Sequence, residues 1–146
     1  MRCGAMTSAI GTALSGLQAS SKRVEASASN IANSRNSIGR EDADVRAAAP
    51  PEKPSDPPVY RPVRVHQESV SGGGVRAETV PIRPPHVLAY APEDPKADTE
   101  GYVARPNVDY ATEFVEMSQA QHAYEANIRT IETENKMIGA LLNEIH

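Results

Sequence analysis

The sequence predicts a mainly α-helical fold, with N- and C-terminal helices pairing as a coiled-coil-like domain, a small β-rich middle domain and a proline-rich loop. Apolar residues recur at alternating steps of four and three at both ends of the chain, a spacing that keeps one stripe of a helix against a partner. The middle of the chain carries short alternating runs between prolines and glycines, which are typical of small strands and turns.

Four segments follow from these patterns. Residues 1–33 are the N-terminal helix of the coiled-coil domain, 34–58 a Pro/Ala-rich loop or linker, 59–106 the small β-rich middle domain and loop, and 107–146 the C-terminal helix. The 146 residues include 12 prolines, one phenylalanine and no tryptophan, which argues against a large compact core.

The N-terminal helix has a thin apolar stripe in which Ser21 and Ala28 replace larger side chains. Its serines and glycines lower helix propensity, so we expect it to fray alone and to order when packed. The same residues are compatible with an ordinary amphipathic helix in a two-helix hairpin. The large members of the stripe are Ile10, Leu14, Leu17, Val24 and Ile31.

The middle of the chain predicts three short strands in one small antiparallel sheet. They lie around Val63 to Val65, from Val75 to Val80, and from Val87 to Tyr90. The glycines at 72–74 form the turn between the first two strands. Residues 91–106 are predicted to be a loop that Tyr102 and Val103 anchor.

The C-terminal helix carries the longer repeat. Asp109, after Pro106, is the predicted N-cap. Isoleucine at successive d positions favours assemblies of more than two helices, and polar residues within the stripe can define register. The a positions are Phe114, Gln121, Ile128, Asn135 and Leu142, and the d positions are Tyr110, Met117, Tyr124, Ile131, Ile138 and Ile145.

Several classes of function find no support in the composition. The net charge of −4 argues against electrostatic capture of nucleic acid. The sequence contains no run of 18 apolar residues, so no membrane-spanning helix is predicted. The histidines lack metal-ligand spacing, and the acidic residues Glu93, Asp94, Asp98 and Glu100 lack that of a calcium loop. We therefore expect no catalytic, metal or cofactor site and no direct membrane insertion.

Three sequence blocks resemble a known family. Ser29-Asn30-Ile31-Ala32-Asn33 resembles the SNIAN signature of flagellar rod and hook proteins. Gly101-Tyr102-Val103 and Pro106-Asn107-Val108-Asp109 are similar to the block before the last helix of the FlgC family of proximal rod proteins, and Tyr124-Glu125-Ala126-Asn127 resembles the YEAN of that helix. The order of the blocks resembles that of the FlgC family.

The resemblance implies a non-enzymatic structural subunit of the bacterial flagellar basal-body rod. Such proteins leave the cell through the flagellar type III export apparatus without a cleaved signal peptide and polymerise in the periplasmic space into the torque-transmitting proximal rod. The implied partners are copies of the chain, other rod proteins and the export apparatus.

We expect the two stripes to pack against each other, with neighbouring subunits completing the burial. The predicted contacts join Ile10, Leu14, Leu17, Val24 and Ile31 to Tyr124, Ile128, Ile131, Ile138 and Leu142, and the predicted subunit-interaction residues also include Phe114 and Met117. The alternative is a soluble coiled-coil adaptor that binds partner helices without forming a filament. Sedimentation distinguishes the two, because an adaptor forms a defined small oligomer.

Overall fold

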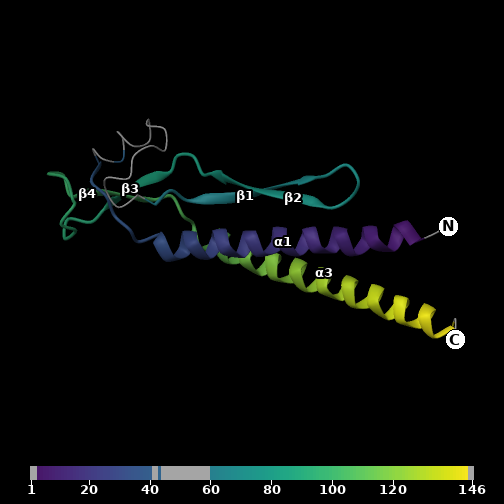
Figure 1. Ribbon diagram of the computed structural model, residues 1–146. Helices are drawn as coiled ribbons and strands as arrows, with labels where there is room; N and C mark the ends of the chain where they lie inside the picture. The colour runs from purple at the N-terminus through teal and green to yellow at the C-terminus, as the bar shows by residue number, and fades with distance from the viewer. Residues whose placement is uncertain (1–2, 41–42, 44–59, 145–146) are drawn as a thin grey trace.

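The computed structural model describes residues 3–40, 43 and 60–144 (Figure 1). Along the described chain, one long helix comes first, four short strands follow, and a second long helix comes last. Both chain ends lie at one end of the molecule, and β3 and β4 lie at the other (Figure 1). The elements are α1 (Cys3–Asn33), β1 (Val63–Ser69), β2 (Val75–Pro81), β3 (His86–Tyr90), β4 (Tyr102–Pro106) and α3 (Tyr110–Glu144).

The strands form two antiparallel pairs, not one sheet. β1 pairs with β2, with Val63 opposite Pro81, and β3 pairs with β4, with Leu88 opposite Ala104. The predicted single three-stranded sheet was therefore wrong, and β4 lies in a segment predicted to be a loop. Prolines end β2 and separate it from β3, and a proline cannot donate the backbone hydrogen bond that a continuous ladder needs.

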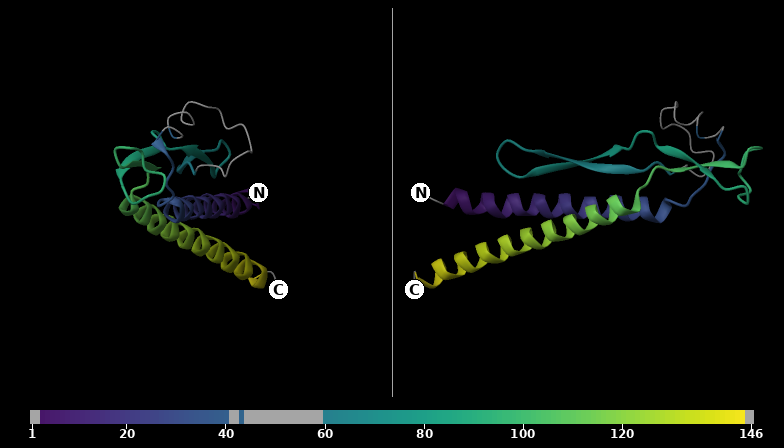
Figure 2. Two further views of the ribbon diagram at one scale, coloured as in Figure 1. Left: turned by 90° about the vertical axis from the view of Figure 1, so that its left-hand side faces the viewer. Right: turned by 180° about the vertical axis from the view of Figure 1, so that it is seen from behind.

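The helix α1 lies between two layers, with α3 on one side and the β1–β2 hairpin on the other (Figure 2). The helices cross near the strand-bearing end of the molecule and diverge toward their free ends (Figures 1 and 2). Most of the predicted 34–58 loop lies outside the described residues. Of its described part, Ile38 forms an antiparallel bridge with Ala104.

The described core is built from small residues. Ala13, Ala19, Ala26 and Ala120 are buried in the helical layers, and Val103 is the largest fully buried side chain. Burial of an aliphatic side chain stabilises a fold in proportion to its apolar area, so alanines contribute little each. A single chain therefore has a thin core for helices of this length.

The predicted N-cap of α3 is confirmed. The carboxylate of Asp109 accepts hydrogen bonds from the N–H of Ala111 at 3.4 Å and of Thr112 at 3.2 Å. The Thr112 hydroxyl and then its N–H hold the pKa of Asp109 below its ordinary value of 3.8. Because the folded-state pKa is depressed, this contribution to stability is complete above the ordinary pKa and is lost as the pH falls through the folded-state pKa.

We predict that Asp109→Asn reduces the acid sensitivity of the fold. Asparagine caps a helix about as well as aspartate but does not titrate. At neutral pH the variant should match the parent, and below about pH 4 the parent should lose stability that the variant retains. Denaturant midpoints measured across this range test this. Equal acid dependence of the two proteins would show that the cap does not depend on the Asp109 charge.

Candidate assembly surface

The contact between α1 and α3 within one chain is made by small and polar residues. Ala13, Ser20 and Ser27 of α1 are buried, as is Ala120 of α3. A Cβ added at Gly16 would lie 2.6 Å from the Nδ2 atom of the Asn127 side chain. A Cβ at this position would therefore require the Asn127 side chain to move.

A buried amide joins three elements at the strand-bearing end of this contact. Asn30 of α1 donates from Nδ2 to the Glu113 carboxylate of α3 at 2.7 Å and to the backbone oxygen of Val63 of β1 at 2.8 Å. Its Oδ1 accepts from the Tyr60 hydroxyl at 2.7 Å and from the Val63 N–H at 3.1 Å. All the hydrogen-bonding capacity of the side chain is used.

Charged and hydroxyl groups extend this contact along both helices. The Arg23 guanidinium pairs with the Glu116 carboxylate at 2.5 Å, and the Ser34 and Tyr110 hydroxyls lie 2.6 Å apart. Burial, and further the negative charge of Glu113, raise the pKa of Tyr60. The inner contact is therefore largely polar, and specific hydrogen bonds determine how the helices are placed.

The predicted apolar stripe of α3 does not form this inner contact. Phe114 is 59% exposed and Leu142 is 62% exposed, and Gln121 and Asn135 also face outward. The inner contact uses the residues one position earlier, including Glu113, Ala120 and Asn127. One residue along a helix turns a side chain by about 100°. In the single chain Ile128 is 36% exposed and Leu142 62%, so their packing against α1, with neighbouring subunits completing the burial, stays a prediction.

The predicted contact residues fall into two groups. Ile10, Leu17, Val24 and Ile31 of α1 and Met117, Ile131 and Ile138 of α3 are half-buried, whereas Leu14, Phe114, Tyr124, Ile128 and Leu142 are exposed. The half-buried residues lie at the margin of the inner contact. The exposed ones extend the apolar surface away from it.

The two stripes meet at an open groove, which we call the helix groove. It has a volume of about 670 Å³ and an opening toward solvent. Its apolar floor comes from Val24 of α1 and from Phe114, Met117 and Tyr124 of α3. The polar residues around it are Ser21, Glu25, Ser118 and Gln121.

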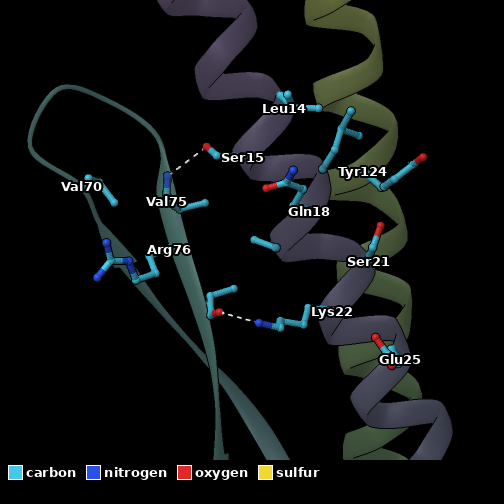
Figure 3. A pocket seen from close by; sticks show the side chains of 13 residues that line it. Leu14, Ser15, Gln18, Ser21, Lys22, Glu25, Val70, Val75, Arg76 and Tyr124 are labelled. Carbon is cyan, nitrogen blue, oxygen red and sulfur yellow. Dashed lines mark hydrogen bonds between the residues drawn. The ribbon is translucent and has the colours of Figure 1, made fainter.

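A second groove of about 710 Å³ separates α1 from the β1–β2 hairpin. Figure 3 shows Ser15 and Lys22 reaching across from α1 to the hairpin. The Ser15 hydroxyl accepts from the Val75 N–H at 3.0 Å, and the Lys22 ammonium donates to the Ala77 oxygen at 3.0 Å. Gly74, with φ of +91°, approaches Ser15 so closely that a Cβ would lie 2.5 Å from its hydroxyl.

The comparisons with known proteins agree with this architecture. The chain is 34% identical over 124 residues to the flagellar basal-body rod protein FlgC of Salmonella typhimurium, covering 85% of this chain and 86% of the relative. The chain belongs to the FlgC family. The FlgC of Yersinia enterocolitica matches with the same identity and coverage, and that of Aquifex aeolicus is 48% identical over 42 residues, 29% of this chain and 31% of the relative. A model of the C-terminal region of flagellar basal body rod FlgEFG proteins matches residues 99–144.

The FlgC-like N-terminal block surrounds the buried amide. Asn30 is its centre, and Ser29 accepts a hydrogen bond at its backbone oxygen from the Asn33 side chain at 2.9 Å. Ile31 is half-buried and Ala32 is exposed. The resemblance in this block thus falls on residues that hold α1 to its neighbours.

The blocks near α3 have comparable local roles. Gly101 has φ of +83° and makes the turn into β4, where Tyr102 contacts Tyr90 edge-on and Val103 is buried. Asn107 bonds the backbone oxygens of Pro84 and Pro85. Pro106 is buried, Val108 is half-buried, Asp109 caps α3, Asn127 packs at Gly16, and Glu125 and Ala126 are exposed.

Sequence reasoning missed Glu113 and Arg23 as contact residues. Glu113 lies in the first turn of α3, and its burial beside Asn30 makes it part of the inner contact. The available signal was the row of small residues one position before the apolar stripe, at Ala13, Ser20 and Ser27. Small residues at heptad spacing allow close helix approach, whereas large ones at the next position remain available to other partners.

No metal or membrane role emerges from the described residues. They bring no three His, Cys, Asp or Glu side chains together in a way that could hold a metal ion, and neither helix has the length and apolar character that crossing a membrane requires. Asp94 and Asp98, two of the acidic residues before β4, accept backbone hydrogen bonds from Lys96 and Tyr102. They stabilise the turn.

We predict that Asn30→Ala destabilises the fold by about 2–3 kcal/mol, because it leaves the Glu113 carboxylate and the Val63 N–H without a partner. Denaturant unfolding measures this. Asn33→Ala is the matched control, because Asn33 bonds within its own helix end, and it should cost about 0.5–1 kcal/mol. Equal losses in the two variants would argue against a special role for the buried amide.

A glycine pair tests the close helix approach. Gly11 has nothing within 4 Å of an added Cβ, so Gly11→Ala should stabilise the protein by about 0.5–1 kcal/mol through helix propensity. Gly16→Ala gains the same propensity but must displace Asn127, so it should be less stable than Gly11→Ala by about 1–3 kcal/mol. Thermal unfolding of both variants measures the difference. Equal stabilities would show that the Asn127 side chain moves aside at no cost.

Proposed function

We infer that this FlgC-family chain, a structural subunit of the flagellar basal-body rod, polymerises through the outward stripes of its terminal helices. The observation that carries the proposal is the exposure of large apolar residues at heptad spacing beside an inner contact of small residues. Because the inner contact leaves Phe114, Ile128 and Leu142 exposed, they are available to neighbouring copies.

The energetics favour burial of these residues between copies. Covering a side chain such as leucine or phenylalanine contributes about 1.5–3 kcal/mol. Exposed apolar residues also lie at other positions around α3, at Val115, Met137 and Leu141. A helix that is apolar on several sides is suited to burial among several partners, as in a multi-helix, coiled-coil-like assembly.

The helix groove is the receiving surface that this arrangement offers. Its floor contains Val24 and Met117, which are half-buried, and Phe114 and Tyr124, which are exposed. A contact between this groove and a different surface of the next copy is head-to-tail. Such contacts propagate into an open filament instead of closing into a ring or dimer.

The wider assignment follows the family. The proposed partners are other copies of the chain, other rod proteins and the flagellar type III export apparatus. The proposed location is the rod in the periplasmic space after export without a cleaved signal peptide, and the proposed role is structural, without catalysis, nucleic acid or direct membrane insertion. The thin core supports export, because a chain with few buried large side chains unfolds readily.

We predict that Phe114→Asp and Leu142→Asp prevent rod assembly while leaving the folded chain intact. Both side chains are exposed, so each change should alter the stability of the single chain by less than about 0.5 kcal/mol. A charge buried between copies would be unpaired, which is strongly unfavourable. The measurements are swimming, recovery of rods from cells, and unfolding of the purified chain.

Thr133→Asp is the matched control for these variants. Thr133 is exposed on the same helix, about half a turn away from the inner contact and off the stripe. It adds the same charge and should leave swimming unchanged. Normal rods in cells that carry Phe114→Asp would contradict the proposed role of the stripe.

A further inference from the structure

Among the described residues, two strand edges of the hairpins have no backbone partner along part of their length. In an antiparallel pair of strands, the backbone N–H and C=O groups of two directly opposite residues either hydrogen-bond to each other or both point away from the partner strand. Ala104 of β4 exchanges backbone hydrogen bonds with Ile38, so Leu88, directly opposite, points its backbone groups away from β4. Tyr102 bonds to Asp98, so Tyr90 opposite points outward as well.

The same reasoning applies to the β1–β2 hairpin. Val75 and Ala77 of β2 bond outward to α1, so Ser69 and Gln67 of β1, directly opposite, point away from β2. Asn30 covers the beginning of β1 at Val63. Side chains or backbone of the same chain thus cover the outer edges of β2 and β4, whereas the described residues place no backbone partner on β3 at Leu88 or on β1 at Gln67.

The edge of β3 lacks the features that keep strand edges apart. Strand edges are usually protected by charged residues, proline or bulges. Residues 86–90 contain no Asp, Glu, Lys, Arg or Pro, and Val87, Leu88 and Tyr90 are 43%, 52% and 68% exposed. β1 in contrast carries Arg64, His66 and Glu68. The outer edge of β3 is therefore neutral and apolar, and it is suited to pairing with another strand. The outer edge of β1 is charged, and at Gln67 it also has no backbone partner among the described residues.

We propose that the outer edge of β3 pairs antiparallel with the outer edge of β1 in a second copy, with Leu88 opposite Gln67. This rests on the proposed function, because it requires neighbouring copies in a polymer. Pairing of two β3 edges would relate the copies by a two-fold axis and close into a dimer, whereas β3 with β1 is head-to-tail and can propagate.

Charge favours the antiparallel direction. With Leu88 opposite Gln67, β3 ends at Tyr90 beside the beginning of β1, and the turn that follows Tyr90 and carries Glu93 lies near Arg64. Both side chains are exposed, and the described residues offer Glu93 no ion-pair partner. The parallel direction would instead bring Glu93 toward Glu68. Opposite charges across an interface favour the correct register more than they add affinity.

Cysteine cross-linking in assembled rods tests the pairing. Opposed residues that bond to each other have Cα atoms about 5.5 Å apart, which is within reach of a disulfide. The full chain with Cys3→Ser, Leu88→Cys and Gln67→Cys should give a ladder of covalent multimers when isolated rods are mildly oxidised. Neither single cysteine variant should form dimers. Dimers from Leu88→Cys alone would indicate β3–β3 pairing and overturn the proposal, as would absence of the ladder in rods of normal appearance.

A proline variant separates this inference from the proposed function. A second cysteine pair, Tyr90→Cys with Val65→Cys, lies opposite in the same register and leaves position 88 free for substitution. The Leu88 N–H is not used in the β3–β4 ladder, so in that background Leu88→Pro should keep the fold but lose the ladder of multimers, and Leu88→Val should retain it. If Phe114→Asp abolishes rods whereas Leu88→Pro leaves both the rods and the ladder of multimers intact, the edge pairing alone is overturned. Swimming unaffected by Phe114→Asp would overturn the proposed function. If Leu88→Pro abolishes swimming but the cysteine variant gives no ladder, the edge of β3 pairs with another protein. That result would overturn pairing between copies.

Discussion

The hydrogen bonds of one amide side chain hold the parts of this molecule together. Asn30 contacts α3 through Glu113, β1 through Val63 and the segment before β1 through Tyr60, and both Asn30 and Glu113 are buried. A buried polar group is costly when unpaired, so a fully paired one strongly disfavours other arrangements of the same elements. The orientation of α1 against its two neighbours thus depends on groups that have only one good set of partners.

Small and large side chains have separate tasks in this chain. Alanine, serine and glycine lie where α1 meets α3, and this lets the helix axes come close together. The larger residues, such as Phe114 and Leu142, face outward. A chain organised in this way gains little stability from its own core, and the proposed contacts between copies would add stability by burying these larger residues. Stability and assembly are then coupled, as in other systems where partner binding stabilises the folded state.

Much of this architecture could be predicted from the sequence. The alternation of four and three residues predicted both helices and the stripe residues, and Asp109 after Pro106 predicted the start of α3. Periodicity could not show which of two adjacent faces meets α1, because spacing gives relative positions around a helix and not its rotation. That choice depends on Gly16 and the buried pair Asn30–Glu113, whose partners come from distant parts of the chain. β4 was missed because its five residues include a proline and an arginine, and its pairing is completed by Ile38.

The placement of both chain ends at one end of the molecule, opposite β3 and β4, makes the subunit polar along its long axis (Figure 1). Copies stacked in one direction build an object with two chemically different tips, one formed by helix ends and the other by strands and turns. An incoming copy can join each tip only with the complementary end. In the proposed polymer, the asymmetry of each subunit would therefore make the two ends distinguishable to any protein that binds them.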